Sequence, residues 1–228
     1  MTGQVLPHHA HELLIRLTTS PDFDYFPTVS PDGRNIVFVS NRDGKYNLWR
    51  MDIDGGRQTQ LTHGDLDFYP VFSPDGRWVV YEAVSNRPNI WRVPFEGGSP
   101  MRVSDRPAGF PAVSPDGKLI ACWTDQPLAE KSQVAIIPFE GGPPVQLLDF
   151  NPQSYLRWSP EGRFLIYVGA HQGGANLWRI PLDGGAQQQL TNFPSAQIWY
   201  FDFRGDGKQL VYSSGARSSD AVMISEER

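Results

Sequence analysis

Aspartates that precede apolar segments are the residues of this sequence best suited to acid–base chemistry. They are Asp22, Asp24, Asp65, Asp67 and Asp105. A glycosidase needs two carboxylates across a cleft, one as the acid and one as the base or nucleophile, and paired aspartates could also hold Ca²⁺ through their oxygens. The spacing selects no catalytic pair and matches no EF-hand loop. Asp24 and Asp67 each lie six residues before a recurring turn, where we expect them to cap a loop by hydrogen bonds.

Histidine and cysteine form no pattern of metal ligands or nucleophiles. The histidines are His8, His9, His11, His63 and His171, three near the N-terminus and two standing alone. Zinc sites use several such ligands at short, defined spacings, so we expect no metal site and no cofactor. Cys122 lies in an apolar segment without a neighbouring His or basic residue, which favours a buried core position over a reactive thiol. Because the sequence also has no Gly-x-Ser-x-Gly elbow and no phosphate-binding loop, it assigns no catalytic residues and favours a protein without enzymatic activity.

The charge balance limits the classes of partner. The 228 residues include 20 Lys and Arg against 25 Asp and Glu, which gives a net charge of −5. Nucleic acids and anionic membranes are bound through clustered positive charge, so neither is an expected partner. No apolar run is long enough to span a bilayer, and the N-terminus lacks the basic and apolar regions of an export signal. We expect a monomer without membrane insertion and, for the chain as given, a cytoplasmic location.

A four-residue turn motif recurs along the chain at nearly even intervals. The copies are Ser30-Pro31-Asp32-Gly33, Ser73-Pro74-Asp75-Gly76, Ser114-Pro115-Asp116-Gly117 and Ser159-Pro160-Glu161-Gly162, with a degenerate fifth at Arg204-Gly205-Asp206-Gly207. The steps between them are 43, 41, 45 and 45 residues. Proline fixes φ, the acidic side chain bonds to the backbone, and glycine supplies a positive φ. One such turn per forty-odd residues is typical of a β-propeller with one blade per repeat.

Each repeat contains four short segments with the composition of β-strands. In the first repeat they cover residues 26–29, 36–38, 47–50 and 60–62. The second segments are almost unbroken apolar runs, which suits strands that are covered on both faces. We predict an all-β fold, a five-bladed β-propeller of four-stranded blades that occupies residues 11–228 as one domain after a flexible segment at 1–10. Trp49, Trp91 and Trp178 recur at one position of the third segment, and we expect them in the core.

The fifth repeat ends after its third segment. A candidate for its outer strand stands near the N-terminus, at Arg16-Leu17-Thr18. A ring closes best when one blade is built from both termini, because no strand edge is then left free. We predict that residues 15–18 pair with residues 221–224 in the last blade. The same ending would arise if the chain were cut from a larger ring.

The repeat unit resembles the TolB-type, WD-repeat-like β-propeller repeat. The likeness rests on x-Pro-x-Phe-Ser-Pro-Asp-Gly followed by Asn-x-Trp-Arg, Asp-Gly-Gly and Gln-Leu-Thr, and it runs from about Leu14 to the C-terminus. The stretch from Tyr212 to Ser225 is similar to the end of propellers attached to bacterial serine/threonine kinases and winged-helix regulators. The resemblance implies a rigid disc that binds peptides or proteins, and a TolB-like role would imply a periplasmic location. TolB itself has six blades and an extra N-terminal domain, whereas this sequence has five repeats.

The loops of the predicted disc fall on two faces. The Pro-Asp-Gly and Asp-Gly-Gly turns share one face and are nearly identical between repeats, whereas the loops of the other face, the variable face, differ strongly. Function concentrates on loops held by a rigid scaffold, and aromatic and Arg side chains supply much of the energy of binding. The candidate ligand-binding residues on the variable face are Arg42, Tyr46, Phe68, Arg87 and Trp199.

The inner segments place side chains toward the central channel. One aromatic residue recurs at the same offset in each, at Phe26, Tyr69, Phe110, Tyr155 and Tyr200, and we interpret these rings as wedges between blades. Two positions before the turn serine, or its equivalent in the fifth repeat, the residues are Thr28, Val71, Ala112, Arg157 and Asp202. An unpaired charge in a channel is costly, so Arg157 and Asp202 are expected to line the channel and to pair.

These observations favour a binding module over an enzyme. The predicted function is a scaffold that captures a protein or peptide on the variable face and at the channel mouth. One alternative is a carbohydrate-active hydrolase or lyase with carboxylates at the channel mouth. Another is a sensor segment of a larger kinase or regulator.

Overall fold

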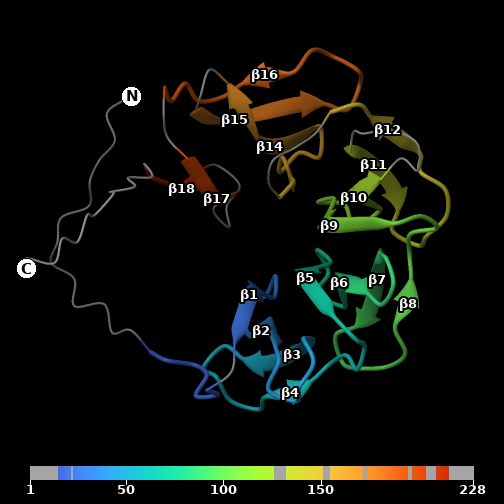
Figure 1. Cartoon of the computed structure of the whole chain (residues 1–228), viewed down its shortest axis with the longest axis vertical. Helices are drawn as coiled ribbons and strands as arrows, with labels where there is room; N and C mark the ends of the chain where they lie inside the picture. Colours follow the sequence, from blue (N-terminus) through green and yellow to red (C-terminus); the bar gives the residue numbers. More distant parts are fainter. Residues whose placement is uncertain are drawn as a thin grey trace, which may run out of the picture.

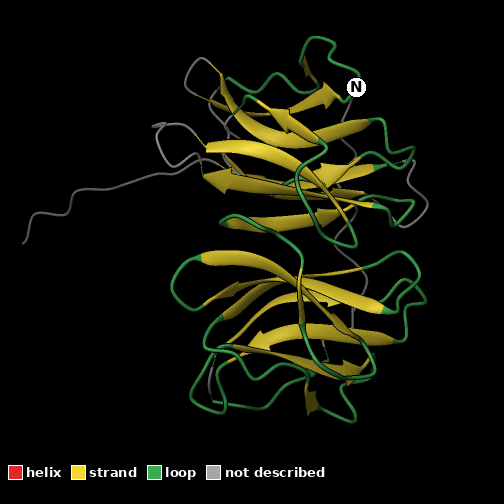
Figure 2. Ribbon diagram, turned by 90° about the vertical axis from the view of Figure 1, so that its right-hand side faces the viewer, coloured by secondary structure: helices red, strands yellow, loops and turns green. Residues whose placement is uncertain are grey.

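The chain folds as a disc of β-sheets arranged around a centre (Figure 1). The computed structural model describes residues 15–21, 23–125, 132–150, 155–171, 174–194, 197–203 and 209–215. These ranges contain strands, turns and bends, and none of their residues lies in a helix that could cross a membrane. A side view shows the loops gathered on the two faces of the disc, with the strands running between them (Figure 2).

Each of the first four repeats forms one four-stranded antiparallel sheet whose strands pair in chain order. Blade 1 contains β1 (Asp24–Val29), β2 (Asn35–Ser40), β3 (Asn47–Asp52) and β4 (Thr59–Gln60), and blade 2 contains β5 (Asp67–Phe72), β6 (Trp78–Val84), β7 (Pro88–Pro94) and β8 (Met101–Arg102). Blade 3 contains β9 (Ala108–Val113), β10 (Leu119–Asp125), β11 (Ser132–Pro138) and β12 (Gln146–Leu148), and blade 4 contains β13 (Arg157–Trp158), β14 (Phe164–His171), β15 (Gly174–Pro181) and β16 (Gln188–Gln189). Blade 5 is described as β17 (Gln197–Phe203) paired with β18 (Leu210–Gly215). The predicted all-β, five-bladed β-propeller is confirmed.

The recurring turn is a compact hydrogen-bonded unit that joins the first two strands of a blade. In blade 1 the Ser30 hydroxyl donates to Asp32 (2.6 Å), and the same Asp32 oxygen accepts the Arg34 N–H (3.1 Å). The Asn35 N–H in turn donates to the Ser30 hydroxyl (3.0 Å), and Gly33 has a φ of 73°. Since the same contacts recur in blades 2 and 3, the four-residue motif fixes where each inner strand ends.

The core lies between consecutive blades. Val37 and Val39 of blade 1 pack with Val79 and Tyr81 of blade 2, and equivalent clusters join blades 2 and 3, 3 and 4, and 4 and 5. The second strands of blades 1 to 4 are therefore covered on both faces, as their apolar composition predicts, whereas β18 of blade 5 is largely exposed. Cys122 lies in the cluster between blades 2 and 3, where complete burial raises the pKa of its thiol to about 12. It is the core residue that the sequence predicts.

The outer strands are short because a hydroxyl side chain ends their ladder. They begin near the predicted positions, but β4, β8 and β16 have two residues each. The Leu48 N–H donates to the side chain of Thr62 (2.9 Å), and the Ile90 N–H donates to that of Ser104 (2.9 Å). A side-chain oxygen thus takes the place of the next ladder partner, which a reading of strand propensity does not anticipate.

The three recurrent tryptophans were expected in the core, but the structure places them at its edge. Trp49, Trp91 and Trp178 are half-buried and pack against the inter-blade clusters from outside. Trp158 is buried instead, and its indole N–H donates to the Ala112 carbonyl (2.9 Å). The wide indole of the third strand reaches past the edge of the cluster, so one ring face stays near the surface.

The segment at residues 16–18 has the local geometry of an outer strand. The Arg16 side chain donates to the Thr18 carbonyl (2.6 Å), as the side chains of Gln60, Arg102 and Gln189 do to the carbonyl two residues later. Leu17 packs on Ile36, Phe38 and Met51, the face of blade 1 that corresponds to the faces covered by Leu61 and Val103 in the next blades. The predicted strand partner at residues 221–224 lies outside the described residues, so the closure stays a prediction.

We expect Leu17→Ala to destabilise the propeller because the Leu17 side chain covers an apolar face of blade 1. The loss should be about 2 kcal/mol, the lower end of the range for leucine truncation, since the side chain is half-buried. Chemical denaturation of Leu17→Ala and of the control Ile15→Ala, whose side chain is 67% exposed, measures it. Equal stability of both variants would show that the segment holds nothing together.

Candidate functional site: the central channel

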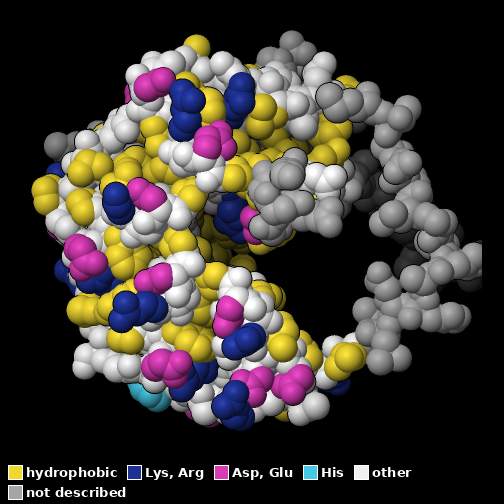
Figure 3. Space-filling model, turned by 180° about the vertical axis from the view of Figure 1, so that it is seen from behind, with side chains coloured by type: hydrophobic (Ala, Val, Ile, Leu, Met, Phe, Trp, Pro, Cys, Tyr) yellow, Lys and Arg dark blue, Asp and Glu magenta, His cyan; other side chains and the backbone are white. Residues whose placement is uncertain are grey.

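The channel is lined by the inner strands of the five blades. Strands β1, β5, β9 and β17 lie nearest the centre of the ring in Figure 1, and the reverse view shows a central hollow with hydrophobic walls surrounded by charged side chains (Figure 3). The hollow contains a cavity of about 660 Å³. Its walls consist of Phe26, Pro27, Thr28, Tyr69, Pro70, Val71, Phe110, Pro111, Ala112, Val113, Pro115, Tyr155, Arg157, Trp158, Tyr200 and Asp202.

The recurrent inner-strand aromatics form a continuous chain of ring contacts across all five blades. The ring centroids are 4.6 Å apart for Phe26 and Tyr69, 4.3 Å for Tyr69 and Phe110, 5.9 Å for Phe110 and Tyr155, and 6.1 Å for Tyr155 and Tyr200. These are favourable separations for tilted aromatic pairs. The rings bridge neighbouring blades, as the wedge interpretation holds, and they also line the cavity. We call this set of five aromatic side chains, one from each blade, the aromatic ring of the channel.

Three of these residues reach the channel through a strained backbone. Phe26, Tyr69 and Phe110 have φ angles of 49°, 53° and 54°. Each coincides with an irregularity in the pairing of β1, β5 or β9, and such bulges re-aim side chains. A left-handed conformation costs a non-glycine residue about 1–3 kcal/mol and clusters at functional sites. The same strained conformation thus recurs at the equivalent position of three blades.

Arg157 and Asp202 add a charged pair to the wall between blades 4 and 5. The Arg157 Nε lies 3.3 Å from an Asp202 oxygen, so the ion pair expected from the sequence is present. A second nitrogen of Arg157 donates to the Tyr200 hydroxyl (2.9 Å), which in turn donates to Asp202 (3.3 Å). The guanidinium also faces the Tyr200 ring at 5.5 Å. The pair is half-exposed to the cavity and is held in place by its tyrosine neighbour.

Glu82 is a buried carboxylate behind the aromatic ring. Its Oε2 accepts the backbone N–H of Phe110 (3.0 Å), and a Cβ on Gly109 would clash with the same oxygen. Burial raises the pKa of the Glu82 carboxyl, and the Phe110 hydrogen bond opposes that rise only in part. Glu82 therefore supports the strained backbone of blade 3 across the interface from blade 2. Its signal in the sequence is an acidic residue inside the apolar run of β6.

The predicted ligand-binding residues of the variable face have different environments. Arg42 is engaged within blade 1, where it contacts Ser40, Gln58 and Asp24. Arg87 is exposed on the loop between β6 and β7. The side chain of Trp199 lies outside the described residues. Tyr46 and Phe68 are half-buried and pack together at 5.5 Å.

Tyr46 and Phe68 belong to an aromatic band that leads from the variable face to the channel. Phe23 and Tyr25 stack at 5.6 Å with their planes 7° apart, and Tyr25 contacts Tyr46 at 6.3 Å. Phe68 then contacts Phe26, a member of the aromatic ring, at 6.5 Å. Phe23 is 59% exposed, so the band offers apolar surface at its outer end.

The cavity itself lies on the other side of the aromatic ring. The inner strands run from the variable face toward the Pro-Asp-Gly turns, and the cavity wall includes Thr28 and Val71 beyond the rings as well as Pro115 in a turn. Because the turns are alike between blades, the sequence alone favours a structural role for the turn face. The three left-handed aromatics each precede a proline, at Phe26, Tyr69 and Phe110, a recurrence that distinguishes blades 1 to 3 in the sequence.

The described part of the chain contains no group of three or more His, Cys, Asp or Glu side chains that could hold a metal ion. Asp67 has the loop-capping role expected of it, since it accepts the backbone N–H of Gly64 in its own loop. Asp24 accepts from the side chain of Arg42 (3.2 Å) instead, so the capping role predicted for it is not what the structure shows. What the channel offers chemically is stacking surface, three phenolic side chains at Tyr69, Tyr155 and Tyr200, and one ion pair. Burial raises the pKa of the Tyr69 phenol to about 12.

Known proteins share this repeat and this architecture. Residues 15–197 match the family described as the TolB beta propeller domain. An uncharacterized protein of Agrobacterium fabrum is 34% identical over 167 residues, which cover 67% of this chain and 57% of that relative. A TolB-type structure from Agrobacterium tumefaciens has a TM-score of 0.74 at 20% identity and covers 88% of this chain and 73% of that one. An oligogalacturonate lyase of Vibrio parahaemolyticus has a TM-score of 0.66 at 17% identity, with 88% and 62% covered.

These matches support conclusions of different scope. The two structural matches lie below a quarter sequence identity and show the fold alone. The chain spans little more than half the length of the Agrobacterium fabrum relative.

We expect Glu82→Gln to stabilise the propeller at neutral pH. A carboxyl whose pKa is raised on folding binds its proton more tightly in the folded state, so stability falls as pH rises from the unfolded value, about 4.3, through the folded one. Glutamine keeps an acceptor for Phe110 and removes that titration. The gain in melting temperature over the wild type should appear as pH rises through this window and stay constant above it. Parallel pH profiles of the two proteins would contradict this account.

Proposed function

We propose that this chain, which belongs to the TolB β-propeller family, is a scaffold that binds a protein or peptide, and that its central channel receives a segment of the partner. The observation that carries the proposal is the aromatic ring, in which three of five members hold a left-handed backbone that directs them to the channel. The strain is accounted for if the rings are presented to a ligand.

The cavity has the size and chemistry of a site for peptide side chains. A volume of about 660 Å³ falls within the range of about 300–1,000 Å³ that is common for ligand pockets, which combine apolar walls with a few placed polar groups. Here the apolar part comes from the rings and from four prolines, and the polar part comes from Arg157, Tyr200 and Asp202. An aliphatic, aromatic or proline side chain would stack on the rings, and the partner's backbone would meet the Arg157–Asp202 pair.

A carbohydrate-active enzyme receives less support from the same wall. Among the described residues that line the cavity, Asp202 is the one carboxylate, and it is paired with Arg157. General acid–base cleavage of a glycosidic bond needs a second carboxylate at a working distance. The resemblance to the oligogalacturonate lyase concerns the fold alone.

The test is selection of binders from a random-sequence peptide library displayed on phage, followed by affinity measurements on variants. Tyr200→Ala should weaken the selected peptides about tenfold, because a truncated aromatic contact typically costs more than 1 kcal/mol. The control is Ile53→Ala on the β3–β4 turn, since Ile53 and Tyr200 are each 47% exposed. Arg87→Ala tests the variable face separately.

The outcomes separate the sites. Loss of affinity in Tyr200→Ala alone supports the channel, and loss in Arg87→Ala alone would move binding to the variable face. Cleavage of oligogalacturonides that depends on Asp202 would replace the scaffold with an enzyme.

A further inference from the structure

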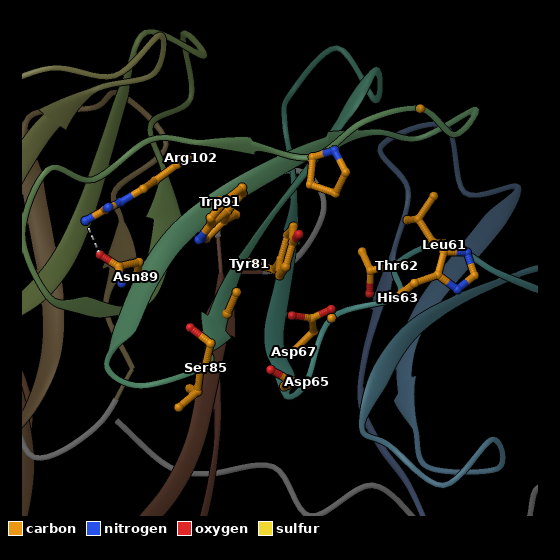
Figure 4. Close-up of a pocket in the computed structure, with 15 residues that line it drawn as sticks. Leu61, Thr62, His63, Asp65, Asp67, Tyr81, Ser85, Asn89, Trp91 and Arg102 are labelled. Atoms are coloured by element: carbon orange, nitrogen blue, oxygen red, sulfur yellow. Dashed lines mark hydrogen bonds between the residues drawn. The ribbon is translucent and has the colours of Figure 1, made fainter.

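A second hollow lies at the rim of the propeller, between blades 1 and 2 (Figure 4). It has a volume of about 440 Å³ and is lined by Trp91 and Tyr81 together with Asp67, Ser85 and Arg102. Trp91 and Tyr81 are direct cross-strand neighbours of β6 and β7. Figure 4 shows these two rings and the Asp67 carboxylate around one space, with Ser85 at its edge.

Blade 1 has the same site, and there a side chain of the chain itself occupies it. The Arg42 guanidinium lies 4.6 Å from the Trp49 ring and 5.2 Å from the Phe38 ring, and these rings are direct cross-strand neighbours of β2 and β3. It also donates to Gln58 (2.6 Å), Ser40 (2.9 Å) and Asp24 (3.2 Å). Two aromatic faces and a carboxylate thus hold one guanidinium, a favourable combination of cation–π and charged contacts.

The two sites correspond residue by residue through the repeat. Phe38 and Trp49 correspond to Tyr81 and Trp91, and Asp24 corresponds to Asp67, each at the same strand position. The position of Arg42, two residues after Ser40, corresponds in blade 2 to Ser85, two residues after Ala83. All these blade 2 residues line the hollow. Blade 2 therefore keeps the rings and the carboxylate of the site but carries a short side chain where blade 1 carries its arginine.

The equivalent positions of blades 3 and 4 have different side chains or different surroundings. In blade 3 the corresponding residues are Cys122 and Ala135, which provide no aromatic face. In blade 4 the corresponding ring, Tyr167, is covered by Phe150 at 4.6 Å. Among the described blades, blade 2 thus combines the complete aromatic pair with a hollow, onto which Trp91 is partly exposed while Tyr81 (2% exposed) and Asp67 form its floor.

The electrostatic contrast between the two carboxylates agrees with this comparison. Asp67 is 1% exposed, and burial raises the pKa of its carboxyl despite hydrogen bonds from Thr62 and Asn47. The pKa of Asp24 is lowered, because hydrogen bonds from Ser40, Thr18 and Arg42 outweigh the effect of burial. A cation placed on Asp67 as Arg42 is placed on Asp24 would relieve the cost of burying that charge.

The other charged groups at the hollow are engaged or lie at its edge. Arg102 donates to Asn89 (2.7 Å) and to the Ser104 carbonyl (2.8 Å), which holds its guanidinium at the rim. Asp65 is paired with Lys45 (2.6 Å), and His63 is exposed. Asp67 is the carboxylate that faces the rings of Tyr81 and Trp91 in Figure 4.

We propose that the hollow in blade 2 is a binding site for an arginine side chain of a partner protein, which takes the place that Arg42 takes in blade 1. The guanidinium would lie over Trp91 and Tyr81 and donate to Asp67. Ser85 and His63 lie on the loops of the variable face, so an arginine approaching that face reaches the site. The site is separate from the channel and does not depend on the function proposed for it.

The probe is a capped Gly-Arg-Gly peptide, with Gly-Lys-Gly as its match, titrated into the full chain. The readout is the indole N–H resonance of Trp91, assigned by its loss in Trp91→Phe. We expect a saturable shift with the arginine peptide and a response about tenfold weaker with the lysine peptide, because a compact ammonium cannot cover two rings and a carboxylate together. Equal binding of the two peptides would overturn the assignment to arginine.

Two variants test the placement. Ser85→Arg supplies the site with its own guanidinium, as in blade 1, and should abolish the shift while raising the melting temperature. Asp67→Asn should weaken binding about tenfold through loss of the charged acceptor. An unchanged shift in Ser85→Arg would overturn the proposal. A shift that appears only in Arg87→Ala would overturn it as well, because the occupant would then be the chain's own Arg87.

Discussion

Packing between consecutive blades is the interaction on which the rest of this structure depends. A single four-stranded sheet has two apolar faces and cannot bury either of them alone, so each blade is stable only against its neighbours. The outer-strand residues Leu61 and Val103 reach across to the next blade, and Leu17 does the same for blade 1. Arg50 and Arg92 add a second tie, since each donates to a carbonyl in the turn of the following blade, Phe95 or Phe139. Because these contacts fix the angle between blades, they also fix what the inner strands present to the channel.

The channel shows how the same repeat can serve structure and function at once. Its rings bridge blades and also line the cavity, and the bulges at Phe26, Tyr69 and Phe110 hold three of them in a left-handed conformation. The support comes from outside the ring, where Glu82 accepts the Phe110 N–H and Gly109 leaves room for that carboxylate. A buried, destabilised carboxylate that positions a strained backbone is an arrangement in which stability is given up for geometry.

The sequence predicts the fold well because the decisive signals are local and repeated. The Ser-Pro-Asp-Gly turns, the apolar second strands and the period all follow from residues close in the chain, and they suffice for a five-bladed propeller. The ion pair of Arg157 and Asp202 could also be predicted, since equivalent positions in adjacent blades lie at one level. The sequence could not predict the half-burial of Trp49, the short outer strands or the side of the aromatic ring on which the cavity lies. Each depends on contacts between blades, or on backbone angles at the bulges, that strand propensity does not encode.

Comparison between blades separates residues that build the fold from residues that depart from it. A position filled alike in the first four repeats, such as the turn serine, is explained by the architecture. A departure calls for its own explanation, and two of the departures here involve charged side chains. Arg157 and Asp202 stand where blades 1 to 3 have Thr28, Val71 and Ala112, and Ser85 stands where blade 1 has Arg42. In the first case a uniform wall gains charge, and in the second an internal contact is left for another molecule to make. Since the packing between blades needs neither change, we interpret both as adaptations for binding.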